Sequence, residues 1–263
     1  MLILMGYIGV GLVTGLLAGL FGMGGGVIIV PAIVWLLLYS GAHPDIVMHT
    51  AIGCSLAVMV FTTMGSIWTH YRAGHLLGKT YFRLMPGAVT GVILGAIISN
   101  LLDTHILQIL FGCFLWLIAL RVAFLRITTD ELHLPHPLRL NLVGGSIGFI
   151  SGLLGIGGGA FMTPILAGYG VSLPEAAGVS SINSLVTGVI GTIVWQVWQS
   201  FYAVNLGGNE LSTPWAIVFL IGIPGLLAAP FGVKLAYRLP VIYLKYSFAF
   251  LLTVIGIDLV SRA

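Results

Sequence analysis

The chain begins with a run from Met1 to Pro44 that contains no charged residue. A water-facing surface needs many polar side chains, and soluble domains carry roughly 25% charged residues. Here only 6% of the residues are charged and 59% are hydrophobic, and the mean hydropathy is +1.12. Lipid must therefore be the solvent. Because a helix satisfies its own backbone hydrogen bonds, the sequence predicts an all-α polytopic membrane protein.

Apolar segments of helical length follow one another along the chain. The first uncharged run is too long for one span, which needs about 20 residues, and it is interrupted at Gly22-Met23-Gly24-Gly25-Gly26. The expected helices cover residues 3–21, 27–40, 49–70, 84–100, 106–125, 141–154, 160–170, 176–200, 214–236 and 241–260. The second and seventh are short, so we expect about eight spans and up to ten helical elements, two of them broken or re-entrant.

The two halves of the chain share one pattern of glycines and a proline. A shift of 133 residues places Gly11, Gly15, Gly19, Gly22, Gly24, Gly25, Gly26 and Pro31 on Gly144, Gly148, Gly152, Gly155, Gly157, Gly158, Gly159 and Pro164. Abundant glycine, with 37 in the chain, does not by itself keep this spacing together with a proline. We therefore predict two transmembrane repeats, residues 1–125 and 141–263, joined by a polar cytoplasmic linker over residues 126–140.

The charges of the loops predict that the second repeat is inverted in the membrane. Short cytoplasmic loops are enriched in Lys and Arg. The loop after the third helix holds Arg72, Lys79 and Arg83, whereas its counterpart over residues 201–213 has no Lys or Arg and contains Glu210. The linker then lies in the cytoplasm and the N-terminus outside. Inverted repeats with broken helices are a recurrent plan of transporters, in which one repeat rocks against the other.

The glycine clusters Gly24-Gly25-Gly26 and Gly157-Gly158-Gly159 are the candidate ligand site. Each precedes a helix whose first N–H groups are unpaired and carry partial positive charge, so two facing breaks suit a small anion. Ser55, Ser180 and Asn183 are candidate side-chain donors. The alternatives stay open: glycines also let helices pack closely, and hydroxyls also bond between helices or to their own helix.

Other chemistries find little support in the sequence. The seven histidines form no HxxxH or HxH pair, the acids lie at expected helix ends or in loops, and no Gly-Lys-Ser/Thr follows the glycines. We therefore expect no catalytic residues, no metal, no cofactor and no enzyme. The expected partners are a small anionic substrate and the lipid bilayer, with no nucleic acid, and a homodimer is a candidate assembly.

The duplicated glycine-rich start, from Gly15 to Pro31 and from Gly148 to Pro164, resembles that of the TauE/SafE family of sulfite exporters and anion permeases. Ala51-Ile52-Gly53-Cys54-Ser55 resembles a second feature of the family. The resemblance covers nearly the whole chain. It implies a multi-pass protein of the bacterial inner membrane that exports sulfite or small organosulfonates, such as sulfoacetate or products derived from taurine. A passive anion channel and a permease for another small anion are the alternatives.

Overall fold

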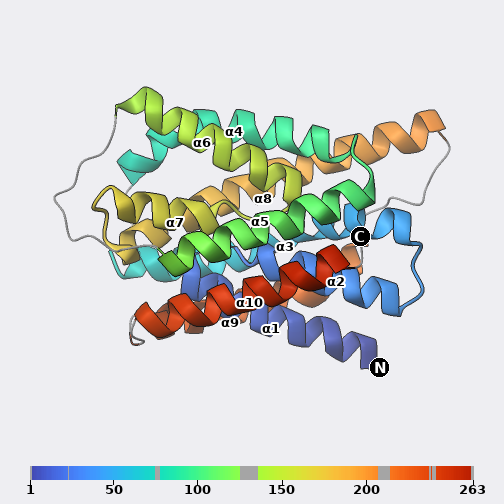
Figure 1. Ribbon diagram of the computed structural model, residues 1–263, viewed down its shortest axis with the longest axis horizontal. Coiled ribbons are helices and arrows are strands. Elements are labelled where there is room, and N and C mark those ends of the chain that lie inside the picture. The colour runs from blue at the N-terminus through green and yellow to red at the C-terminus, as the bar shows by residue number, and fades with distance from the viewer. Residues whose placement is uncertain are drawn as a thin grey trace.

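The computed structural model describes residues 2–22, 24–74, 78–124, 136–206, 214–236, 238 and 241–261. The regular elements of this part are ten α-helices that lie lengthwise in one bundle (Figure 1). They are α1 (Leu2–Phe21), α2 (Gly26–Tyr39), α3 (Pro44–Arg72), α4 (Gly78–Ser99), α5 (Thr104–Phe124), α6 (Pro137–Leu154), α7 (Gly159–Gly168), α8 (Leu173–Leu206), α9 (Trp215–Ala236) and α10 (Val241–Ser261). Seven of the described helices are long and apolar enough to cross a membrane, which confirms a polytopic helical membrane protein.

The helices agree with the expected ones in number and order, but four of them extend several residues beyond the expected bounds. Helices α3 and α4 begin at Pro44 and Gly78 rather than at 49 and 84. Helix α6 begins at Pro137 rather than at 141, because proline is accommodated in the first turn of a helix and the His136 side chain accepts a hydrogen bond from the Leu138 N–H. Helix α8 is 34 residues long and extends beyond both expected ends. Most of the predicted linker, up to residue 135, lies outside the described residues.

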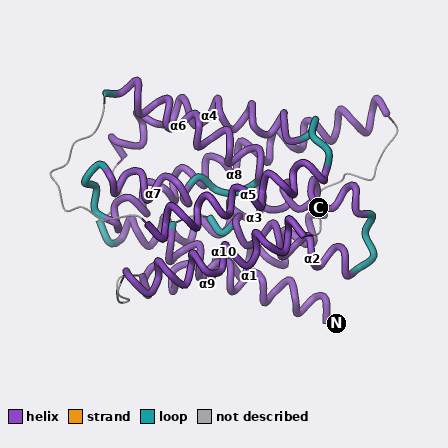
Figure 2. Tube along the Cα trace, viewed as in Figure 1, coloured by secondary structure: helices purple, strands orange, loops and turns teal. Residues whose placement is uncertain are grey.

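The two glycine-rich breaks turn the chain back inside the bundle. Figure 2 shows both of these loops in the middle of the molecule, whereas the other described loops lie at its two ends. The start of α1 and the end of α2 consequently lie at one end of the molecule, and the start of α6 and the end of α7 lie at the other (Figure 1). Each broken pair thus forms a hairpin whose tip is buried.

The two halves of the chain are interleaved. Helix α1 packs against α9, and its counterpart α6 packs against α4, while α3 meets α8 and α5 meets α10. Glycines make the first two contacts very close: a β-carbon added at Gly15 would lie 2.2 Å from the Gly225 carbonyl oxygen, and one added at Gly148 would lie 2.3 Å from the Ala88 oxygen. Since Gly15 and Gly148 are the pair that the 133-residue shift superposes, equivalent glycines make equivalent contacts.

Equivalent helices run in opposite directions along the bundle. In Figure 1, α3 runs from right to left and α8 from left to right, and α5 and α10 are opposed in the same way. Basic residues lie in the last turns of α3, α5 and α9, at Arg72, Arg121 and Lys234, and these helix ends share the left end of Figure 1. The positive-inside rule would place that end in the cytoplasm, so the sidedness stays a prediction that the arrangement supports.

Candidate anion site at the two helix breaks

The two breaks lie against each other at the centre of the bundle. A β-carbon added at Gly26 would lie 2.4 Å from the Gly155 carbonyl oxygen and 3.1 Å from the Gly157 nitrogen. Residues 24–26 and 155–160 are all buried. The start of α2 therefore meets the loop directly before α7 in the protein interior, where a backbone without regular hydrogen bonds must be satisfied by protein groups or by a ligand.

Glycine is required by the backbone of the first break more than by that of the second. Gly24 and Gly25 have φ of +68° and +84°, in the left-handed region that L side chains rarely adopt. In the second break Gly155 has a φ of +66°, but Gly158, the N-cap of α7, has a φ of −58°. At Gly158 the constraint is space instead, because an added β-carbon would lie 2.2 Å from Nδ2 of Asn183.

Hydroxyls of α3 hold the carbonyl groups of both breaks. The Ser55 hydroxyl donates to the Gly155 carbonyl oxygen at 2.8 Å, and the Thr62 hydroxyl donates to the Gly24 carbonyl oxygen at 2.8 Å. Both hydroxyls are fully buried. In this structure the predicted donor Ser55 is thus engaged with the backbone of the opposite repeat, and it stabilises the shape of the break.

Helix α8 carries buried polar groups without partners. Asn183, Ser184 and Thr187 are 0% exposed, and among the described residues no hydrogen-bond partner reaches their side-chain oxygen and nitrogen atoms. Asn183 lies against Gly158, and Ser184 lies against Gly24, where an added β-carbon would be 3.1 Å from the Ser184 Cβ. Buried polar side chains nearly always have partners, so this cluster requires a specific explanation.

The remaining predicted donor, Ser180, hydrogen-bonds with Thr163 of α7 at 2.8 Å between the two hydroxyl oxygens. It therefore joins α7 to α8 one turn away from Asn183. Thr62, Ser184 and Met59 border the breaks but were not among the predicted site residues. Polar type marks Thr62 and Ser184, and Ser184 directly follows Asn183, whereas nothing in its type marks Met59.

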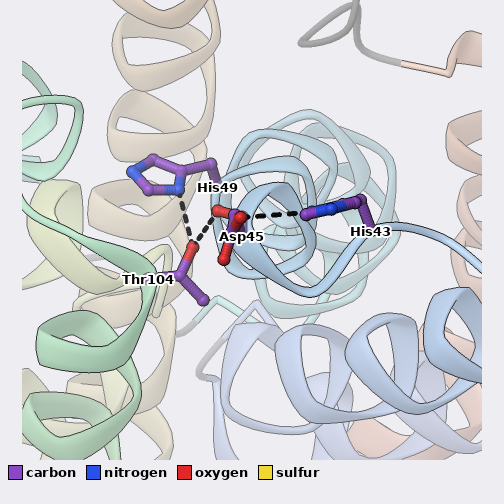
Figure 3. Close-up of polar contacts among 4 residues, drawn as sticks. All are labelled: His43, Asp45, His49 and Thr104. Atoms are coloured by element: carbon purple, nitrogen blue, oxygen red, sulfur yellow. Dashed lines mark hydrogen bonds and ion pairs between the residues drawn. The ribbon is translucent and has the colours of Figure 1, made fainter.

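A second polar cluster joins the start of α3 to the start of α5. The Thr104 hydroxyl lies between the Asp45 backbone oxygen, to which it donates, and Nδ1 of His49 at 3.1 Å (Figure 3). Nε2 of His49 bonds to the Leu102 carbonyl oxygen at 2.9 Å, and His43 pairs with the Asp45 carboxylate at 3.2 Å. These contacts stabilise one end of the bundle. Within the described part of the chain, no three His, Cys, Asp or Glu residues form a group that could hold a metal.

The fold and the buried breaks define a polytopic α-helical membrane transporter. The family model described as "Sulfite exporter TauE/SafE" matches residues 7–259, and the chain belongs to this family. Relatives include a "Probable membrane transporter protein" of Haemophilus influenzae, 31% identical over 95% of both chains, and one of Methanocaldococcus jannaschii, 30% identical over 94% of this chain and 92% of the relative.

A more distant relative carries a different description. An arabinosyl transferase of Edwardsiella ictaluri is 30% identical over 142 residues, which are 54% of this chain but 23% of the transferase. No solved structure matches the chain. The two relatives that match nearly the whole chain therefore indicate a membrane transporter.

Proposed function

We propose that this chain is a secondary transporter that exports a small sulfur-containing anion, such as sulfite or an organosulfonate, across the inner membrane. The observation that carries the proposal is the Asn183 amide, which is fully buried beside Gly158 at the start of α7 and has no hydrogen-bond partner among the described residues. A buried polar group without a partner costs about 1–3 kcal/mol. A bound ligand would recover that free energy.

The pairing of the backbone supports an anion rather than a cation. Ser55 and Thr62 donate to one carbonyl oxygen of each break, and the starts of α2 and α7 contribute N–H groups that have no acceptor within their own helices. Such helix N-termini carry partial positive charge. The side chains that border the breaks are neutral, so an anion would be held by dipoles and neutral donors and released more readily than from a buried arginine.

The sulfur-containing substrate rests on the family. Its description names sulfite export, whereas the relatives are described only as probable membrane transporters. A site formed by a few donors between two touching breaks suits a small oxyanion. The same donors would also bind another small oxyanion, so a permease for a different anion is the first alternative.

A passive anion channel is the second alternative. The described groups at the breaks, including Asn183 and Ser184, are fully buried. A site closed off from both faces is what a carrier needs between its two open states, and this burial supports a carrier over an open pore. Transport against a concentration gradient distinguishes the two.

The proposal also includes the partners, the location and the assembly of the protein. We take the chain to work without a cofactor or a nucleic-acid partner and without catalysing a reaction, in the lipid of an inner membrane and as a candidate homodimer. Acidic side chains that could act as catalysts, such as Asp45, Glu175 and Asp258, lie in the first or last turns of described helices.

Thermal stability in detergent tests the proposed site. We expect sulfite, sulfoacetate, taurine or thiosulfate to raise the Tm of the purified protein, because a ligand that binds the folded state stabilises it. Asn183→Ala should weaken binding of the effective anion by about 1–3 kcal/mol, roughly 5- to 150-fold. Asn100→Ala is the matched control, because Asn100 directly follows α4 and its amide nitrogen donates to the Ala96 carbonyl oxygen of that helix.

Transport into proteoliposomes tests the function itself. The wild type should move the same anion against its gradient when an ion gradient is applied, and Asn183→Ala should not. The proposed function would be refuted by a folded protein that neither binds nor transports any of these anions. The proposed site would be refuted if Asn183→Ala and Asn100→Ala behaved alike.

A further inference from the structure

The side chain of Met59 lies between the two breaks. Its sulfur accepts a hydrogen bond from the Gly157 N–H, with 2.9 Å between sulfur and nitrogen. The same sulfur would lie 3.2 Å from a β-carbon added at Gly24. Met59 is 0% exposed. The uncharged Met59 sulfur thus contacts both breaks, at the point where the proposed anion would accept hydrogen bonds from backbone N–H groups.

We propose that Met59 stands in for the substrate anion in the empty transporter and is displaced when the anion binds. This inference rests on the proposed function and assigns the Met59 thioether to the regulation of that same site. The thioether partly satisfies the Gly157 N–H while the site is empty, and it leaves when a better acceptor arrives.

The chemistry of the pair supports displacement. A thioether sulfur is a weak acceptor, whereas an anionic oxygen forms hydrogen bonds with N–H groups that are roughly twice as strong as neutral ones. A backbone N–H at the start of a helix also favours negative charge. Exchange of the sulfur for an oxyanion is therefore favourable at this N–H. Methionine is unbranched and has three rotatable side-chain bonds, so its sulfur can move without a shift of α3.

The symmetry of the two repeats points to the same place. Gly22 packs on Ala177 and Gly155 packs on Ile52, so the structure superposes α3 on α8 with a shift of 125 residues. That shift places Met59 on Ser184, and Ser184 lies against Gly24 as Met59 lies against Gly157. The second repeat thus presents a hydroxyl without a partner to the first break, and the first repeat presents to the second break an acceptor that already has a partner.

Core filling alone gives a different expectation. A buried methionine that only fills space is replaced by leucine at small cost, and its replacement should not change the affinity of a site for anions. If Met59 instead competes with the anion, then the affinity should depend on how well residue 59 accepts a hydrogen bond. Leucine accepts none, and glutamine offers an amide oxygen that is a stronger acceptor than sulfur.

Titration of purified variants with sodium sulfite and with sulfoacetate tests this inference by calorimetry. Met59→Leu should bind the anion about 2- to 10-fold more tightly than the wild type, because the Gly157 N–H loses its competing partner. Met59→Ala should also bind more tightly, and it covers the case in which leucine obstructs the ligand. Met59→Gln should bind more weakly. Met48→Leu, in the same helix and equally buried, should bind like the wild type.

The outcomes separate the two proposals. If the wild type binds neither anion, the proposed substrate fails and the inference about Met59 fails with it. If the wild type binds but Met59→Leu and Met59→Ala bind no more tightly, or Met59→Gln binds no more weakly, then only the inference about Met59 is overturned. The predicted order of affinities, with Met48→Leu unchanged, supports both.

Discussion

Replacement of Gly158 by alanine is the smallest change that should disable the proposed site, although the added β-carbon would also press on Ile147, whose Cγ2 would lie 2.8 Å away. Gly158 has a φ of −58° and a ψ of −5°, which alanine adopts without strain. Its added β-carbon, however, would lie 2.2 Å from Nδ2 of Asn183, whereas ordinary contacts begin at 3.4 Å. The Asn183 amide must therefore move by about 1.2 Å, which is enough to break a hydrogen bond to a bound ligand.

The loss follows from that displacement. A hydrogen bond to a charged group contributes about 1.5–3 kcal/mol, so Gly158→Ala should weaken anion binding by roughly 10- to 150-fold. Gly168→Ala is the matched control in the same helix, because a β-carbon there meets nothing within 4 Å. Calorimetric titration with sulfite measures both variants. Equal dissociation constants for Gly158→Ala and Gly168→Ala, in proteins that are folded and monodisperse, would refute the placement of Asn183 at the ligand.

The other predictions concern packing and orientation. Gly15→Ala should lower the free energy of unfolding by roughly 1–3 kcal/mol through overpacking, and the Tm with it, because its β-carbon would lie 2.2 Å from a backbone oxygen of α9. Gly9→Ala, whose β-carbon meets nothing within 4 Å, should leave the Tm unchanged, and equal Tm values would contradict the close contact of α1 and α9. Thr104→Val should lower the free energy of unfolding by about 1 kcal/mol, and the Tm with it, through loss of its hydrogen bonds. It should leave anion binding unchanged, and weaker binding would show that this end of the bundle is coupled to the site. Cysteines placed at Lys79 and at Asn209, which lies outside the described residues, should be labelled from opposite sides of the membrane, and labelling from one side would reject the inverted repeat.

The helices and the two breaks could be predicted from the sequence because they depend on local chemistry. Long apolar runs fix the spans, and a cluster such as Gly24-Gly25-Gly26 cannot continue a helix at low cost. The partner of each helix could not be predicted. The spacing of Gly11, Gly15 and Gly19 indicates a face for close packing, but it does not say that the face meets α9 of the other repeat.

Part of the candidate site could also be predicted from local chemistry, whereas the contacts between helices could not. Asn183 was selected as a polar side chain at membrane depth, and the structure places it against Gly158. Ser55 and Ser180, its counterpart under the 125-residue shift, are the same residue type, but Ser55 donates to the Gly155 carbonyl oxygen whereas Ser180 bonds to Thr163. The rotation of each helix against its neighbours decides which partner each serine reaches. Hydropathy cannot resolve that rotation when the helices are apolar on most faces.

The interleaved packing changes what can move during transport. We expected one repeat to rock against the other, but α1 is fastened to α9 and α6 to α4 by backbone contacts through glycine. Such contacts leave no space for sliding, so the natural rigid units are these two mixed pairs rather than the two halves of the sequence.

The site lies where these units meet, and the two central helices divide its functions. Helix α3 donates the hydroxyls of Ser55 and Thr62 to carbonyl oxygens of both breaks, which fixes the backbone and occupies its acceptors. Helix α8 contributes Asn183 and Ser184, whose polar atoms have no partner in the described part of the chain. Under the proposed function, α3 would set the polarity of the site and α8 would face the ligand. Under this division, an anion that replaces the Met59 sulfur would bond to groups that belong to both units and would hold them together while it crosses.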